Sequence, residues 1–202
     1  MENKKHWYDG WIYDRIVAPN QKGVFERIEA LIREESDVID IGCGTGRLAF
    51  KLAGKSRSIL GIDLSQTNIR RADSNLKNMP DDKIAFKHSD LAALLKDGTR
   101  HFDYAVLSFV IHEVNEDERV VLLKEAGVIA DKIIICDHLP DTSVFAAITR
   151  EAVEFLAGRE HYRNFRSFVE KEGIIKLAKE SGFKIIHEEI YKSHLQIIIC
   201  SK

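Results

Sequence analysis

Residues 36–50, SDVIDIGCGTGRLAF, contain an apolar run with an acid inside it, followed directly by three closely spaced glycines. The apolar run is interrupted only by Asp40, and the glycines follow as Gly42-x-Gly44-x-Gly46. Glycines at this spacing permit a tight turn and a close approach of backbone to ligand, and a helix that opens there favours negative charge. However, Asp40 would repel a phosphate and would suit a ligand with an ammonium group. The alternative is a purely structural strand–turn–helix.

Two more acids follow strand candidates. Asp63 ends the run SILGID, where an acid in a doubly wound fold can hydrogen-bond a ribose cis-diol. Ser65 then has the position of a helix N-cap. Asp90 follows the apolar run at 84–88, and its carboxylate can either cap the next helix or accept from the exocyclic amine of an adenine.

Elements that would position these acids are visible as apolar runs alternating with helical patterns. We expect strands at 38–41, 58–63, 84–88, 104–110, 132–137, 183–192 and 195–201. We expect helices at 23–35, 46–54, 66–77, 91–96 and 116–130, and a longer helical region at 143–180. Strands of β-branched residues alternating with helices predict a parallel sheet buried on both faces. The last two strands are joined too closely for a parallel crossover, so they must form an antiparallel hairpin.

Composition limits the class of protein. The 202 residues predict one domain, and a net charge of -2 without a basic block argues against a nucleic-acid surface. Three cysteines without paired spacing indicate a reducing compartment. With no signal peptide or apolar stretch of membrane-spanning length in view, we expect a cytoplasmic protein that does not enter a membrane.

The motifs DIGCGTG, GIDLS, SDL and FDYAVLSFVIHEV, in this order, resemble the class I S-adenosylmethionine-dependent methyltransferases. The resemblance is nearest to the small-molecule branch that includes ubiquinone- and menaquinone-type enzymes, and it covers residues 36–138. It implies a doubly wound, Rossmann-like α/β fold of seven strands, mostly parallel with an antiparallel C-terminal hairpin strand and helices on both faces. It divides a single domain, 1–202, into an N-terminal helical or lid segment (1–35), a cofactor-binding core (36–138) and an acceptor-side insertion (141–170).

The resemblance also assigns residue roles. The methionine moiety of S-adenosylmethionine would lie against Asp40 and the loop of Gly42, Cys43, Gly44 and Gly46. Asp63 would bind the ribose, Leu64 would pack near the adenine, Asp90 and Leu91 would bracket it, and Ser108 would contribute backbone near the sulfonium. Tyr13, in an aromatic N-terminal segment, would reach the cofactor or cover the site; alternatively, these aromatics pin an N-terminal helix to the core. The product would be S-adenosylhomocysteine.

The acceptor is less well defined by the sequence. His112 follows the fourth strand and could act as a base with a near-neutral pKa, or it could simply pack. Asp137-His138 closes the fifth strand and could serve the substrate or cap the connection. HEVNE lacks the second histidine of HExxH, and we expect no metal. The sequence therefore predicts a methyltransferase for a small-molecule acceptor, monomeric or homodimeric. The alternatives are a protein or nucleic-acid methyltransferase, a non-catalytic cofactor-binding protein and a nicotinamide-dependent dehydrogenase.

Overall fold

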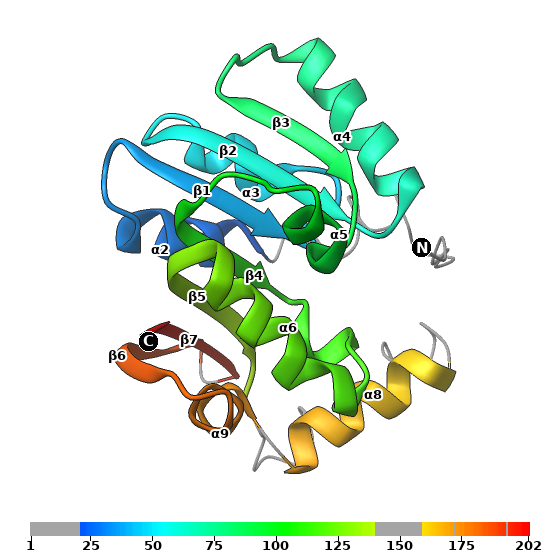
Figure 1. Cartoon of the computed structure of the whole chain (residues 1–202), viewed down its shortest axis with the longest axis vertical. Coiled ribbons are helices and arrows are strands. Elements are labelled where there is room, and N and C mark those ends of the chain that lie inside the picture. Colours follow the sequence, from blue (N-terminus) through cyan, green and yellow to red (C-terminus); the bar gives the residue numbers. More distant parts are fainter. Residues whose placement is uncertain (1–20, 140–158, 172, 193) are drawn as a thin grey trace. The chain divides into compact units, whose positions relative to one another are not determined.

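The computed structural model describes residues 21–139, 159–171, 173–192 and 194–202 (Figure 1). Within these ranges seven strands form one sheet in the order β3-β2-β1-β4-β5-β7-β6. The strands are β1 (Ser36–Ile41), β2 (Ser56–Asp63), β3 (Ile84–His88), β4 (Phe102–Ser108), β5 (Ala130–His138), β6 (Lys184–Tyr191) and β7 (Leu195–Ser201). This strand order confirms the predicted Rossmann-like, doubly wound sheet.

The strands run in the directions that the lengths of their connections predict. β1 pairs parallel with β2, and β2 pairs parallel with β3. At the other end of the strand order, β7 pairs antiparallel with both β5 and β6. The predicted C-terminal hairpin, with its one reversed strand, is therefore confirmed.

The helices mostly begin and end near their expected residues. They are α2 (Lys22–Leu31), α3 (Arg47–Leu52), α4 (Gln66–Asn78), α5 (Leu91–Lys96), the 3-10 helix η2 (Ile111–Glu113), α6 (Glu116–Ile129), α8 (Arg159–Lys171) and α9 (Gly173–Glu180). Several boundaries were predicted too late: β1, β2, β4 and β5 each begin two residues earlier than expected, and α2, α3 and β4 end earlier. α2 ends at Leu31 because Ile32 is extended, and β4 ends at Ser108 because Phe109 has a φ of 59°. Residues 143–158 of the long helical region lie outside the described residues.

Contacts divide the chain into two compact units. The first comprises the described residues up to Val106 together with Ile129–Asp131, and in it α3 packs on β2, while α4 packs on β2 and β3. The second comprises Leu107–Val128 and the described residues from Lys132 onward. There α9 packs on β6 and β7, and α8 packs on η2. The single-domain organisation of 1–202 remains a prediction.

Burial along the strands reflects their place in the sheet. Five of the six residues of β1 are buried, and β7 is buried from Leu195 to Cys200, as expected of strands covered on both faces. β6, the last strand in the order, alternates between exposed and half-buried residues. Among the described helices, none has the length and apolarity needed to cross a bilayer.

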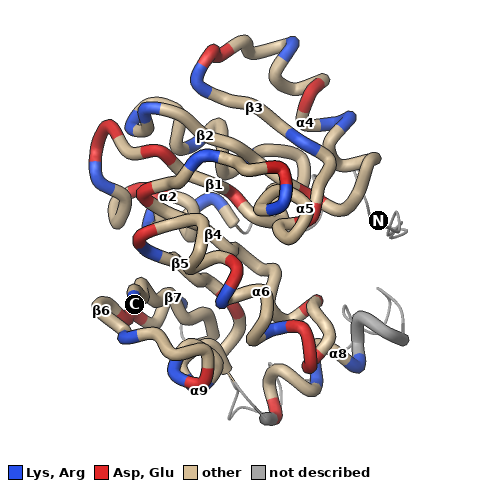
Figure 2. The backbone as a smooth tube through the Cα atoms, viewed as in Figure 1, with Lys and Arg blue, Asp and Glu red and all other residues tan. Residues whose placement is uncertain are grey.

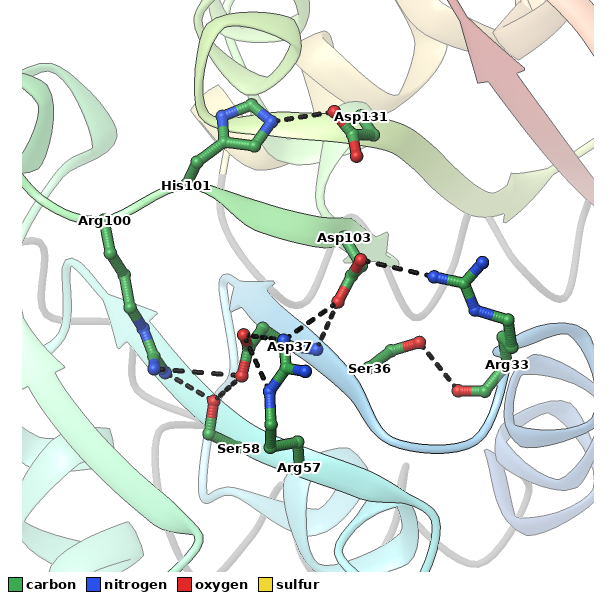
Figure 3. A network of polar contacts seen from close by, with 9 residues as sticks. All are labelled: Arg33, Ser36, Asp37, Arg57, Ser58, Arg100, His101, Asp103 and Asp131. Carbon is green, nitrogen blue, oxygen red and sulfur yellow. Dashed lines mark hydrogen bonds and ion pairs between the residues drawn. The ribbon is translucent and has the colours of Figure 1, made fainter.

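A polar network in the first unit joins the start of β1 to β2 and β4 (Figure 3). The Asp37 carboxylate accepts hydrogen bonds from the Arg57 guanidinium and the Ser58 hydroxyl, while the Asp37 backbone N–H donates to Asp103 at 2.7 Å. Arg57 and Arg33 also form ion pairs with Asp103, at 3.6 and 3.4 Å. The hydrogen bond from Arg57 leads the causes that hold the pKa of the Asp37 carboxyl below its ordinary value.

Candidate active site

The glycine loop between β1 and α3 has the backbone conformation that its spacing predicts. Gly42, Gly44 and Gly46 all have positive φ angles, 73°, 55° and 85°. At Gly46 a Cβ atom would lie 2.4 Å from the Phe86 ring, so a larger residue would be both strained and obstructed. The backbone N–H groups of Gly42 and Cys43 both donate to the Ile62 carbonyl, at 2.8 and 2.9 Å. The loop is thus fixed to the end of β2.

Asp40 is a buried acid beside this loop. It is 1% exposed, and within the described structure neither carboxylate oxygen has a hydrogen-bond partner. Burial, and then the negative charge of Asp63, raises the pKa of Asp40 to about 7. An ionised carboxylate in such surroundings is costly unless a cation or donor meets it. This position therefore fits a ligand that supplies a positive charge.

Asp63, at the end of β2, joins the glycine loop to the turn before α4. Its Oδ2 accepts from the Gly44 N–H at 2.8 Å, and its Oδ1 accepts from the Ser65 N–H at 2.7 Å. Each carboxylate oxygen has two lone pairs, so the same group has the acceptor capacity for a diol as well. The Ser65 hydroxyl accepts from the Asn68 N–H at 3.3 Å, which confirms the predicted N-cap.

The remaining residues assigned to the cofactor in the first unit have mixed surroundings. Asp90 caps α5 by accepting from the Ala93 N–H at 2.6 Å, one of its two predicted roles. The side chain of Leu91 is buried, whereas Leu64 is 37% exposed. The thiol of Cys43 is also buried, and burial raises its pKa well above the ordinary value. Any role of Cys43 in binding therefore belongs to its backbone.

In the second unit, His112 and Asp137 form a buried pair. His112 lies on η2, Asp137 lies near the end of β5, and Nδ1 of His112 is 2.7 Å from Oδ1 of Asp137. Asp137 also accepts from the backbone N–H groups of His112, at 3.2 Å, and His138, at 2.8 Å. Burial raises the pKa of the Asp137 carboxyl, but the charges of His112 and His138 and the hydrogen bonds from these two residues together hold that pKa below its ordinary value. The pairing directs the basic lone pair of a neutral His112 to Nε2.

Aromatic rings surround this pair. Phe165, on α8, meets His112 edge-on at 5.8 Å and His138 at 5.4 Å, measured between ring centroids. Phe109 lies 5.8 Å from His138 and has the left-handed backbone that ends β4. A positive φ is uncommon for a bulky residue and is concentrated at functional sites. Sequence reasoning did not single out Phe109 or Phe165, because neither belongs to a pattern with a chemical role.

His112, Asp137 and His138 are also the group in the described part of the chain that could hold a metal ion. One ligand atom from each lies within 4.8 Å of the others. However, the Asp137 oxygens already accept three N–H groups, two of them from the backbone. Hydrogen bonding thus accounts for the position of the Asp137 carboxylate without an ion.

Comparison with known proteins gives a consistent result. Residues 38–129 match the family described as methyltransferase domain. The ubiquinone biosynthesis O-methyltransferase of Nitrosospira multiformis is 25% identical over 174 residues, covering 84% of this chain and 70% of that protein. The enzyme of the same name from Psychrobacter arcticus is 27% identical over 183 residues, covering 86% and 68%. These matches identify the protein as an S-adenosylmethionine-dependent methyltransferase.

The likeness of this methyltransferase to solved structures extends over its whole length. The magnesium protoporphyrin IX methyltransferase of Synechocystis, solved with bound S-adenosylhomocysteine, has a TM-score of 0.67 at 16% identity. The match covers 100% of this chain and 90% of that one. At such low identity the likeness is one of fold.

The structure places the predicted residues in two groups. Asp40, the glycines and Asp63 lie together in the first unit, as predicted. Ser108, half-buried at the end of β4, and His112 belong to the second. Tyr13 lies outside the described residues. Sequence reasoning noticed Asp137 but did not predict its bond to His112; its position at the end of β5 was the available signal.

Proposed function

We propose that this methyltransferase methylates a hydroxyl group of a small-molecule acceptor and that His112 acts as the general base. The observation that carries the proposal is the buried His112–Asp137 pair, with its 2.7 Å contact between Nδ1 and Oδ1. An aspartate that holds Nδ1 fixes the imidazole orientation and stabilises the imidazolium formed when Nε2 takes a proton.

The residues of the first unit fit S-adenosylmethionine. Asp40 offers the ammonium group of the methionine moiety a buried carboxylate that accepts no hydrogen bond within the described residues, and glycines in the loop permit a close approach of backbone to the ligand. The Asp63 carboxylate can accept hydrogen bonds from the ribose diol, and the Asp90 carboxylate can accept one from the exocyclic amine of the adenine. Bound S-adenosylmethionine supplies an electrophilic methyl group on a sulfonium, with a neutral thioether as the leaving group.

The role of the chain is then to align the acceptor and remove its proton. Nε2 of His112 would take the hydroxyl proton as the oxygen attacks the methyl carbon, and Asp137 would stabilise the resulting imidazolium. A hydroxyl group needs this help, because its oxygen is a poor nucleophile while protonated. A neutral amine can attack without prior loss of a proton, so a buried His–Asp pair favours oxygen as the acceptor atom.

Two further observations support a small hydroxylated acceptor. The relatives from Nitrosospira multiformis and Psychrobacter arcticus are O-methyltransferases by name, and the match to each covers more than four-fifths of this chain. In addition, basic and acidic residues are interspersed along the described backbone (Figure 2). A nucleic-acid surface would need clustered basic residues.

The test begins with calorimetric titration by S-adenosylmethionine, S-adenosylhomocysteine and NADH. Binding of the two sulfur nucleosides without NADH is expected. The protein is then incubated with methyl-labelled S-adenosylmethionine and matched phenols, primary amines and thiols, and the products are identified by mass spectrometry. Methylation of phenols that is lost in His112→Ala supports the proposal. Methylation of amines or thiols at rates that His112→Ala leaves unchanged contradicts it.

A further inference from the structure

We infer that Arg119 and Asn164 form a lock that positions His112 by fastening η2 to α8. The inference rests on the proposed role of His112 as the base, and it assigns a function to two buried polar residues that do not belong to the cofactor site. Both act through His112, so they are positioning residues.

The 3-10 helix that carries His112 has little stability of its own. It spans three residues, and helices of this type have poorer hydrogen-bond geometry than α-helices. The carbonyl groups at its C-terminal end need partners from outside the helix. The carbonyls of Glu113 and Val114 find them in side chains: Nδ2 of Asn164 donates to Glu113 at 2.9 Å, and Nε of Arg119 donates to Val114 at 3.0 Å.

Arg119 and Asn164 are also bonded to each other. Nη2 of Arg119 donates to the backbone carbonyl of Asn164 at 2.7 Å, which closes a ring of hydrogen bonds through η2, the start of α6 and α8. The guanidinium is 0% exposed, and its Cζ lies 5.5 Å from the centroid of the Phe168 ring on α8. Ser167 adds a parallel link, since its hydroxyl donates to Glu116 at 2.7 Å.

Asn164 is well suited to this position. It is buried, and its Nδ2 also donates to Oδ1 of Asn115 at 3.1 Å, so both neighbours are oxygen acceptors. An aspartate of the same shape would present an acceptor to two acceptors. The next residue, Phe165, packs edge-on against His112. The lock thus determines where η2 lies and also where the ring that packs against the imidazole lies.

The key variant is Asn164→Asp, and its matched control is Arg166→Gln, which changes an exposed residue of the same helix that is bonded to Glu170, also on α8. The readout is the NMR signal of the His112 Nδ1–H, identified by its loss in Asp137→Asn, together with backbone amide exchange at residues 112–114. We expect Asn164→Asp to weaken or abolish the Nδ1–H signal and to speed exchange at these amides by about tenfold or more. Exchange in β1 should remain as in the wild type.

A general loss of stability would speed exchange in β1 as well and would leave the Nδ1–H signal of the folded molecules in place. If Asn164→Asp does not fold, Asn164→Ala removes the same donors without adding a charge. A wild-type Nδ1–H signal and wild-type exchange at 112–114 in the folded variant would overturn the lock, as would equal effects in Arg166→Gln. Titration with S-adenosylhomocysteine separates the two proposals: failure of the wild type to bind counts against the cofactor site alone.

Discussion

The carboxylate of Asp63 accepts a hydrogen bond from the Gly44 N–H at 2.8 Å, across nineteen positions of sequence. One side chain therefore holds the glycine loop and, in the proposed cofactor site, also offers the acceptor for the ribose hydroxyls. The second oxygen accepts from Ser65, so the acid is fixed from both sides before any ligand arrives. Such preorganisation lowers the entropy cost of binding.

Substitution of Asp63 tests this arrangement. Asp63→Ala should weaken binding of S-adenosylmethionine by about 10- to 100-fold, because the diol loses a charged acceptor and the loop loses an anchor. Calorimetry measures the effect, and Asp73→Asn, which removes a charge at an exposed position on α4, is the control. Unchanged affinity in Asp63→Ala would remove Asp63 from the site.

Asp40 predicts a pH dependence for cofactor binding. Its carboxyl has a pKa of about 7, and only the ionised form pairs with an ammonium group. The ionised fraction falls as pH falls, so affinity for S-adenosylhomocysteine should weaken by up to about tenfold per pH unit below pH 7. In Asp40→Asn the affinity should be low and nearly independent of pH over this range. The same pH slope in wild type and variant would assign the titration to another group.

His112→Ala tests the proposed base. We expect methylation of a phenolic acceptor to slow by about 100-fold or more, with the affinity for S-adenosylmethionine nearly unchanged. Asp137→Asn should slow transfer as well, because the amide can no longer stabilise an imidazolium. His101→Ala, which removes an exposed histidine bonded to Asp131, should have no effect. Full activity of His112→Ala at every pH would make His112 a packing residue.

Chelation tests the histidine group for a metal. Because hydrogen bonds already account for the geometry around Asp137, we expect EDTA to leave methyl transfer unchanged. Elemental analysis of the purified protein should find less than about one metal ion per ten chains. Loss of activity with EDTA, restored by a divalent cation, would instead assign His112, Asp137 and His138 to a metal site.

Much of the fold could be predicted from the sequence, because the apolar runs and the glycine spacing agree with the tertiary structure. The runs of residues 84–88 and 195–201 are strands with the predicted bounds, and the second, LQIIICS, has the apolar, β-branched composition typical of a buried strand. The glycine spacing likewise predicted a loop whose three φ angles are positive. Contacts between distant segments left no such pattern. The bonds of Asn164 to Glu113 and of His112 to Asp137 join residues 51 and 25 positions apart, and only the folded chain brings them together.

The network around Asp37, at the start of β1, predicts an effect on stability at the opposite end of this strand from the glycine loop (Figure 3). Asp37→Asn should lower the free energy of unfolding by roughly 1–2 kcal/mol at neutral pH, because bonds to a charged acceptor are lost while Arg57 and Ser58 remain. The pKa of Asp37 is depressed in the folded state, so its stabilisation is present above the ordinary pKa of 3.8 and is lost as pH falls through the lower folded value. Urea unfolding should therefore show a difference in the free energy of unfolding between wild type and variant at pH 7 that narrows below about pH 4.

The control is Asp131→Asn, which changes an exposed acid that is bonded only to His101 among the residues drawn in Figure 3. It should change the free energy of unfolding by less than about 0.5 kcal/mol. Equal stability of Asp37→Asn and wild type at pH 7 would show that the network adds nothing to the fold.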